Sequence, residues 1–359
     1  MKTWRDNVRN VVPYVPGEQP NEPNMVKLNT NENPYPPSPL VTKALKDMNT
    51  DTFRLYPDPT AHKLVKALAD YHGLKESEVF VGVGSDDVLA MAFMTFFNGK
   101  EPILFPDITY SFYDVWADLL RIPYETVPLD DDFEIVAEDY VRVNGGVIFP
   151  NPNAPTGAEL SQEKIRRIIE ANPDVVVIVD EAYVDFGAES VLPMIREYDN
   201  LLVVRTFSKS RSMAGMRIGY ACGNEEMIRY LNDVKYSFNS YTMDTTVLAV
   251  GAASVEDEAY FRETIDRIIA TRAWTQEQLT RLGFTFKDSK SNFVFASHER
   301  VPASELFAEL RKEHIYVRYF NKPRIDNYLR ITIGTREEME KLIRFLERYL
   351  SERNKEGEV

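Results

Sequence analysis

Short apolar runs alternate with amphipathic segments through the first two thirds of the chain. Each run is bounded by polar residues, and its length is typical of a buried strand. Between the runs, apolar residues recur at helical spacing, as in Gln162–Glu170. Alternation of this kind predicts βαβ units, and therefore an α/β fold with a largely parallel sheet and helices on both of its faces. The predicted strands are Val79–Val83, Ile103–Phe105, Gly146–Phe149, Val175–Val179 and Leu201–Val204.

The pattern changes from about Met243 onward. Long helical periodicity comes first, followed by short β-patterned runs at Asn292–Ala296, Ile315–Phe320 and Tyr328–Ile333. A capping box, Thr335-Arg-Glu-Glu338, begins the last helix. We therefore predict a smaller α+β domain after the α/β domain. The predicted division is a large domain at 36–248, and a small domain built from 1–35 and 249–359.

Composition narrows the possible partners. The 359 residues carry a formal net charge of −14, which argues against nucleic acid or an anionic membrane as the main partner. A single cysteine, Cys222, excludes an internal disulfide framework and suits a reducing cytoplasm. The first ten residues lack the apolar core of a signal peptide, and no apolar run is long enough for a membrane helix. We expect a cytoplasmic protein with small-molecule ligands and no metal site.

The segment after Leu201–Val204 carries the most distinctive chemistry. It turns abruptly from an apolar run to hydroxyl and basic residues around Lys209, with Arg217 a little further on. In open parallel sheets, ligands bind where strands end. A lysine at such a place can form a Schiff base with an aldehyde once it is deprotonated, and neighbouring cations favour that state. Taken alone, the segment fits a basic surface loop equally well.

Asp180 ends a fully apolar strand, at the same predicted sheet edge as Lys209. A carboxylate there is costly unless a cation meets it. A protonated pyridine nitrogen would serve, and pyridoxal phosphate needs such a partner to act as an electron sink. A helix N-cap or a surface acid is the alternative interpretation of Asp180.

Other strand ends supply groups that complement a phosphorylated aromatic ring. Tyr183 and Asn153 could donate hydrogen bonds to a ring oxygen, and Tyr110 could stack on the ring face. A glycine turn, Gly82-Val-Gly84, precedes a predicted helix whose free amides suit a phosphate. Helix capping by Ser85 or Asp86 explains that turn nearly as well.

Nine motifs, which occur in family order over nearly the whole chain, carry a resemblance to a known family. They are VRNVVPY (8–14), LNTNENP (28–34), YPDP (56–59), GVGSDD (82–87), TYSFY (109–113), NPNAPTG (151–157), DEAYVDF (180–186), TFSKSRSMAGMRIGY (206–220) and LRITIGTREE (329–338). The chain resembles the fold-type I, pyridoxal-phosphate-dependent aminotransferases of classes I and II, and among them the histidinol-phosphate aminotransferases. That likeness implies a mostly parallel sheet between helices, a smaller α+β domain, and a homodimer with shared active sites.

The resemblance also implies roles for individual residues. Lys209 would attach the cofactor and serve as the general base and acid. The other cofactor ligands would be Asp180 at the ring nitrogen, Tyr183 and Asn153 at the ring oxygen, Tyr110 on the ring face, and Ser208, Arg217, Ser85 and Asp86 at the phosphate, the last two through backbone N–H groups. Tyr56 would reach the partner's cofactor phosphate. The substrate ligands would be Tyr14, Asn33, Arg318 and Arg330.

One position departs from the family pattern, and several functions stay open at this point. Many relatives carry an asparagine immediately before Pro-Thr-Gly, where this chain has Ala154, so the role passes to Asn153. The resemblance implies interconversion of L-histidinol phosphate and 2-oxoglutarate with imidazole acetol phosphate and L-glutamate, in histidine biosynthesis. An aromatic amino-acid aminotransferase is the close alternative. A pyridoxal-phosphate-dependent phospho-amino-acid decarboxylase and a non-catalytic nucleotide-binding α/β protein are further ones.

Overall fold

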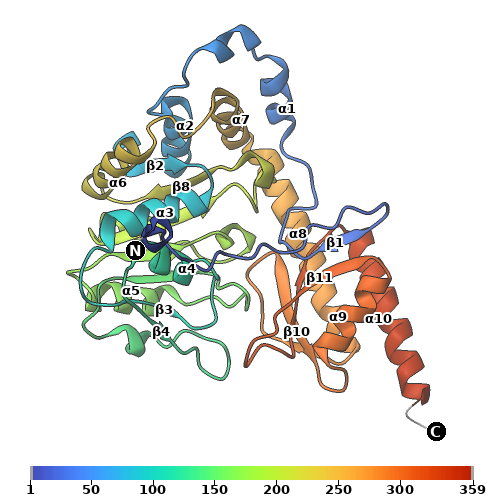
Figure 1. The fold of residues 1–359 in the computed structure, drawn as a ribbon. Helices are drawn as coiled ribbons and strands as arrows, with labels where there is room; N and C mark the ends of the chain where they lie inside the picture. Colours follow the sequence, from blue (N-terminus) through green and yellow to red (C-terminus); the bar gives the residue numbers. More distant parts are fainter. Residues whose placement is uncertain (1–2, 357–359) are drawn as a thin grey trace.

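A computed structural model describes residues 3–356, which form two sheets with their covering helices (Figure 1). The larger sheet has seven strands in the order β2-β8-β7-β6-β5-β3-β4. Neighbours from β7 to β4 pair in parallel, whereas β8 is antiparallel to both β2 and β7. The strands are β2 (Val79–Gly82), β3 (Ile103–Pro106), β4 (Tyr124–Val127), β5 (Val147–Pro150), β6 (Val177–Asp180), β7 (Leu201–Thr206) and β8 (Gly219–Cys222).

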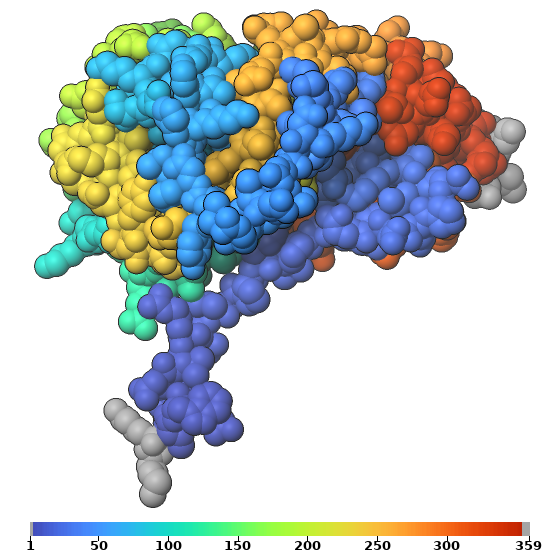
Figure 2. Space-filling model, turned by 90° about the horizontal axis from the view of Figure 1, so that it is seen from above, coloured from blue at the N-terminus to red at the C-terminus, as the bar shows by residue number. Residues whose placement is uncertain are grey.

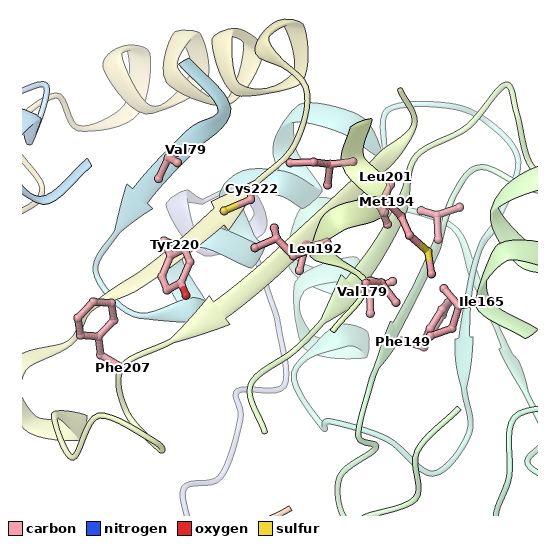
Figure 3. Close-up of a cluster of buried hydrophobic side chains, with 14 of the residues drawn as sticks. Val79, Phe149, Ile165, Val179, Leu192, Met194, Leu201, Phe207, Tyr220 and Cys222 are labelled. Carbon is pink, nitrogen blue, oxygen red and sulfur yellow. The ribbon is translucent and has the colours of Figure 1, made fainter. Parts of the chain in front are cut away.

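Both faces of this sheet are buried, because alternate residues of each strand enter different hydrophobic clusters. Val177 and Val179 of β6 belong to one cluster, and Ile178 between them belongs to the other. This explains why the strands are continuous apolar runs and do not alternate with polar residues. Figure 3 shows part of the first cluster, where Phe149 of β5, Ile165 of a covering helix and Val179 of β6 lie close together.

Helices cover each face. Residues of α1 (Pro39–Lys46), α2 (His62–His72), α5 (Gln162–Ala171) and α7 (Thr245–Glu256) belong to the first cluster. Residues of α3 (Ser85–Phe96), α4 (Tyr113–Leu120) and α6 (Glu225–Phe238) belong to the second. The short 3-10 helices are η1 (Trp4–Asn7), η2 (Thr50–Arg54), η3 (Glu76–Glu78), η4 (Ala137–Tyr140), η5 (Val184–Phe186), η6 (Leu192–Arg196) and η7 (Ala214–Met216).

The smaller sheet joins the two ends of the chain. Its order is β1-β11-β12-β10-β9, with β1 parallel to β11 and the other pairs antiparallel. Three helices, α8 (Glu258–Arg281), α9 (Ala303–Lys312) and α10 (Arg336–Glu356), accompany it (Figure 1). Its strands are β1 (Val26–Leu28), β9 (Phe284–Phe286), β10 (Phe293–His298), β11 (Ile315–Tyr319) and β12 (Leu329–Thr332).

Most predicted elements are confirmed, with shifts at their ends. The capping box of α10 is present, since Thr335 N donates to Glu338 Oε2 (2.7 Å) and Glu338 N donates to Thr335 Oγ1 (3.3 Å). At the turn before α3 the alternative interpretation is wrong, because the N-cap is Gly84 and neither Ser85 nor Asp86 caps the helix. The antiparallel strand β8 was not predicted, since its pairing depends on residues far away in sequence.

The proposed domain boundary at residue 248 falls inside α7. This helix packs against α1 and α2, and its buried residues belong to the first cluster of the large sheet. The buried residues Phe261 and Ile265 of α8 belong to the cluster of the small sheet. We therefore propose Asp257, between α7 and α8, as the boundary.

The N-terminal segment links the two parts. Figure 2 shows its first described residues, in dark blue, standing away from the body of the molecule. Tyr14 stacks on Phe112, with ring centroids 4.1 Å apart, and Glu18 pairs with Arg311 at 2.6 Å. The segment thus crosses from the large-sheet part to the small-sheet part. Within residues 3–356, no helix combines the length and the apolar character needed to cross a membrane.

Candidate active site

A cavity of about 500 Å³ lies at the carboxyl ends of the parallel strands. Pro150, Asp180 and Thr206, the last residues of β5, β6 and β7, all line it. The small sheet and the N-terminal segment form the opposite wall. Eleven of the sequence-predicted residues therefore come together here: Tyr14, Ser85, Asp86, Tyr110, Asp180, Tyr183, Ser208, Lys209, Arg217, Arg318 and Arg330.

Lys209 stands in the loop that follows β7 and is only partly buried. Its Nζ donates a hydrogen bond of 3.1 Å to the backbone oxygen of Thr30. The same Nζ lies 5.8 Å from the ring centroid of Tyr183. Thr30 was not among the predicted site residues. It comes close to Lys209 because β1, just before it, pairs with β11 of the small sheet.

Asp180 is a buried carboxylate without a cationic partner among the described residues. It accepts hydrogen bonds from Tyr113 Oη (3.0 Å) and from Ala182 N (3.2 Å). Burial raises the pKa of Asp180 to about 7, while these two hydrogen bonds act to lower it. A cation placed against this carboxylate would restore its ionised form. Sequence reasoning missed Tyr113, although it belongs to the same TYSFY motif that pointed to Tyr110.

A second polar group gathers at the N-terminus of α3. Asp86 accepts from Tyr110 Oη at 2.7 Å and pairs with Arg217 at 3.0 Å. Backbone and guanidinium approach each other closely here, since a Cβ added at Gly84 would lie 2.5 Å from Arg217 Nη2. Gly84 also has a φ of +85°, which favours glycine. The N-terminus of α3, at Ser85, and the guanidinium of Arg217 therefore face the same part of the cavity. Such an arrangement suits an anion.

Two arginines face each other across the small-sheet wall. Arg318 of β11 and Arg330 of β12 are direct partners in the antiparallel register. Within residues 3–356, Arg318 has no hydrogen bond or ion pair, and Arg330 makes one bond, from Nη2 to Asn29 O (3.0 Å). The Nε of Arg330 is buried without a partner, and burial lowers the pKa of this arginine. Like charges directly opposite each other are destabilising, so this pair calls for an anion.

Tyr183 and Tyr14 line the cavity between these polar ends. Tyr183 Oη accepts a hydrogen bond of 2.9 Å from Asn31 Nδ2. Asn31 is buried and also accepts from Thr332 Oγ1 at 2.9 Å, which ties the tyrosine to the small sheet. Asn31 was missed as well, although it lies in the LNTNENP motif that suggested Asn33.

Three predicted residues do not line the cavity. Asn153 uses its amide within the structure, donating to Ile108 O (2.9 Å) and Thr156 Oγ1 (3.1 Å). It therefore offers no free donor to a ring oxygen. Asn33 donates to Ser210 O at 3.1 Å, away from the cavity surface. Tyr56 is 82 % exposed on the outside of the molecule.

The sequence model of the aminotransferase class I and II family matches residues 23–346 of the chain. The chain is 50% identical over 353 residues to a histidinol-phosphate aminotransferase of Lactococcus lactis subsp. cremoris, which covers 98% of this chain and 99% of the relative. It is 51% identical over 355 residues to the enzyme of the same name from Clostridium beijerinckii, covering 99% of each.

Solved structures share the fold. The histidinol-phosphate aminotransferase of Sinorhizobium meliloti, solved in complex with pyridoxal-5'-phosphate, superimposes with a TM-score of 0.82. The superposition covers 90% of each chain at 24% sequence identity. At that identity the likeness supports the architecture, and the two relatives near half identity carry the family relationship.

Proposed function

The chain belongs to the aminotransferase class I and II family, and we propose that it transfers an amino group from L-histidinol phosphate to 2-oxoglutarate. The products would be imidazole acetol phosphate and L-glutamate, a step of histidine biosynthesis. Relatives that carry the name of this activity are half identical to the chain over nearly all of its length. We also propose a cytoplasmic location, because the single cysteine suits a reducing compartment.

The residues present fit pyridoxal phosphate. Asp180 is a buried carboxylate that lacks a cation, and a protonated pyridine nitrogen would supply one. Ser85, at the N-terminus of α3, together with Ser208 and Arg217, would hold the phosphate. Tyr183 would bond the ring oxygen and Tyr110 would cover the ring face. When bound, the cofactor supplies an electron sink that stabilises negative charge on the carbon bearing the amino group.

The chain's own residues would provide orientation and proton transfer. The Nζ of Lys209 lies in the cavity, where it would attach the cofactor and later move a proton to and from the substrate carbon. Tyr113 Oη donates to Asp180 and so holds the carboxylate in place. The stacked rings of Tyr14 and Phe112 line one side of the cavity and would limit the access of water to it.

The arginine pair is the single observation that carries the substrate assignment. Arg318 and Arg330 face each other with few partners of their own, so an anionic group is needed between or beside them. A guanidinium fork can bind a phosphate or a carboxylate in the same bidentate manner. One pocket could therefore take the phosphate of histidinol phosphate in one half-reaction and a carboxylate of glutamate in the other.

We further propose a homodimer in which Tyr56 contributes to the partner's site. Tyr56 is exposed and stacks on Tyr241, with ring centroids 4.7 Å apart. The loop that carries it is held from inside, since Lys235 Nζ donates to Pro59 O at 3.0 Å. A rigid loop that presents a tyrosine away from its own cavity suits a contact with a second copy of the chain.

A half-reaction panel tests the proposed substrate. The cofactor-loaded protein is mixed separately with histidinol phosphate, phenylalanine, tyrosine and aspartate, and loss of the cofactor's absorbance band is followed. We expect histidinol phosphate to react fastest. Fastest reaction with phenylalanine or tyrosine would indicate an aromatic aminotransferase instead, and release of CO₂ without a need for 2-oxoglutarate would indicate a decarboxylase.

Borohydride reduction followed by peptide mapping tests the role of Lys209. We expect the pyridoxyl label on Lys209, and we expect Lys209→Ala to lower turnover at least about a thousandfold because the proton-transfer group is lost. A label on another lysine would overturn the assignment.

Mixing two variants that should each lose activity tests the shared site. Tyr56→Phe and Lys209→Ala subunits, unfolded and refolded together, should form mixed dimers with one complete site each. Recovery of activity in the mixture supports the shared site, whereas an active monomer in sedimentation analysis would contradict it.

A further inference from the structure

A cluster of charged and hydroxyl side chains with a buried centre involves the residues that directly follow Asp180 and Lys209 in the sequence. Its members are Glu181, Asp185, Ser190, Arg205 and Ser210, and none of them lines the cavity. Glu181 directly follows Asp180, and Ser210 directly follows Lys209. The cluster therefore joins the chain neighbours of the two residues proposed to hold the cofactor ring and its aldehyde.

The centre of the cluster is an ion pair with very little exposure to solvent. Arg205 donates from Nε and Nη2 to Glu181 Oε2, at 2.9 and 2.8 Å. The side chain of Glu181 is fully buried, and that of Arg205 is 10 % exposed. Ser190 bonds to both members of the ion pair. Its Oγ accepts a hydrogen bond from Arg205 Nη2 (2.6 Å) and donates one to Glu181 Oε2 (2.8 Å).

Asp185 extends the cluster to the lysine loop. Its Oδ1 lies 3.5 Å from Arg205 Nη1, and its Oδ2 accepts a hydrogen bond of 2.6 Å from Ser210 Oγ. The backbone oxygen of Ser210 accepts in turn from Asn33 Nδ2 at 3.1 Å. Ser210 is thus held through both its side chain and its carbonyl, and only 2% of it is exposed.

Stability alone is a weak reason for such a cluster. Burying an ion pair costs desolvation energy that the pair roughly recovers, so apolar residues of similar volume often stabilise a core equally well. What ions and hydrogen bonds add is a defined geometry. Lys209 needs that geometry, because its long flexible side chain makes one hydrogen bond within residues 3–356, to Thr30 O.

We propose that Asp185 and Ser210, anchored by the Glu181–Arg205 ion pair, are positioning residues that orient Lys209. The bond from Ser210 to Asp185 sets the direction in which the backbone of residues 209 and 210 leaves β7. The amine at the end of the Lys209 side chain then meets the cofactor aldehyde in one orientation. Asn33, which was expected to bind substrate, acts here by holding Ser210. This inference rests on the role proposed for Lys209.

Two matched serine variants test the inference. Ser210→Ala removes the hydroxyl that faces the lysine loop, and Ser190→Ala removes one from the far side of the same ion pair. For Ser210→Ala we expect about a tenfold lower kcat with KM unchanged within about twofold, because misplacement of a reacting group slows the reaction more than it weakens binding. Ser190→Ala should leave kcat unchanged, although it should lower Tm at least as much as Ser210→Ala does.

Two further measurements are independent of turnover. The first is the circular dichroism of the bound cofactor's visible band, and the second is the rate at which cofactor-free protein attaches the cofactor. Both should change in Ser210→Ala and stay unchanged in Ser190→Ala. Ser210→Thr, which keeps the hydroxyl, should restore them. Asp185→Ala should add little to Ser210→Ala, because both variants remove the bond from Ser210 Oγ to Asp185 Oδ2.

Equal losses of activity in the two serine variants, with an unaltered dichroism band, would reduce the cluster to a structural role and overturn the inference. If borohydride reduction of the wild-type protein left no pyridoxyl label on Lys209, the proposed function itself would fail. A normal label together with an unaffected Ser210→Ala variant would remove only the positioning role.

Discussion

The two walls of the cavity hold their charges in opposite ways. On the large-sheet wall, Asp86 and Arg217 pair with each other, and Asp180 is fixed by hydrogen bonds. On the small-sheet wall, Arg318 and Arg330 are direct neighbours in the strand register, and the Nε of Arg330 is buried without a hydrogen-bond partner among the described residues. On the large-sheet wall, the charged side chains are held by protein partners without a ligand. On the small-sheet wall, the two guanidinium groups are left for an anionic ligand to bind.

This difference matches two kinds of ligand. A cofactor that stays bound through many turnovers needs a site with fixed geometry, because the reacting atoms must return to the same place. Substrates that alternate between a phosphate and a carboxylate need cations that can accept either. The comparison therefore predicts that substitutions on the two walls affect different measurable quantities.

Asp180→Ala should give the largest effect and act on the large-sheet wall. Removing one partner of a buried charge pair leaves the other unpaired, so we expect the affinity for pyridoxal phosphate to fall about 100- to 1,000-fold, with a loss of rate as well. Titration of cofactor-free protein by absorbance measures the affinity. Asp139→Ala, which removes an exposed acid of η4, is the control. Unchanged affinity and rate would contradict the pairing of Asp180 with the ring nitrogen.

Arg330→Met should act on the small-sheet wall and spare the cofactor. Loss of charge-assisted hydrogen bonds should lower kcat/KM in both half-reactions by about 10- to 100-fold, while cofactor affinity remains normal. Arg318→Met should have a smaller effect, because a buried nitrogen without a partner is found on Arg330 and not on Arg318 among the described residues. Arg166→Met, which removes the surface pair with Glu197, is the matched control. An Arg330 variant that loses its cofactor would show that the two walls are not independent.

The smallest expected effect concerns the stability of the cofactor-free protein. Burial raises the pKa of Asp180 to about 7 in the folded chain, against about 4 in an unfolded one. The folded state therefore binds more protons between these values, and this aspartate makes stability fall as the pH rises from about 4 to 7. Tm measured across this range should decline less steeply in Asp180→Asn than in the cofactor-free wild type. Identical slopes would mean that Asp180 is already ionised without the cofactor.

Local sequence patterns were sufficient for most of the secondary structure. Continuous apolar runs such as Val175–Val179 report strands buried on both faces, and the capping box at Thr335 reports the start of α10. Lys209 and Asp180 could also be found, because each is a polar residue at or shortly after the end of a buried strand. These signals arise within a few residues, where periodicity and capping act.

The tertiary structure alone decided which distant groups meet. The pairing of β1 with β11 brings Thr30 and Asn31 to Lys209 and Tyr183, and the register of β11 with β12 sets Arg318 opposite Arg330. The sequence by itself determined the elements and the residues that carry chemistry. Packing determined their partners, because strand pairing and side-chain contact join residues that belong to different elements of the sequence, and no local period records them.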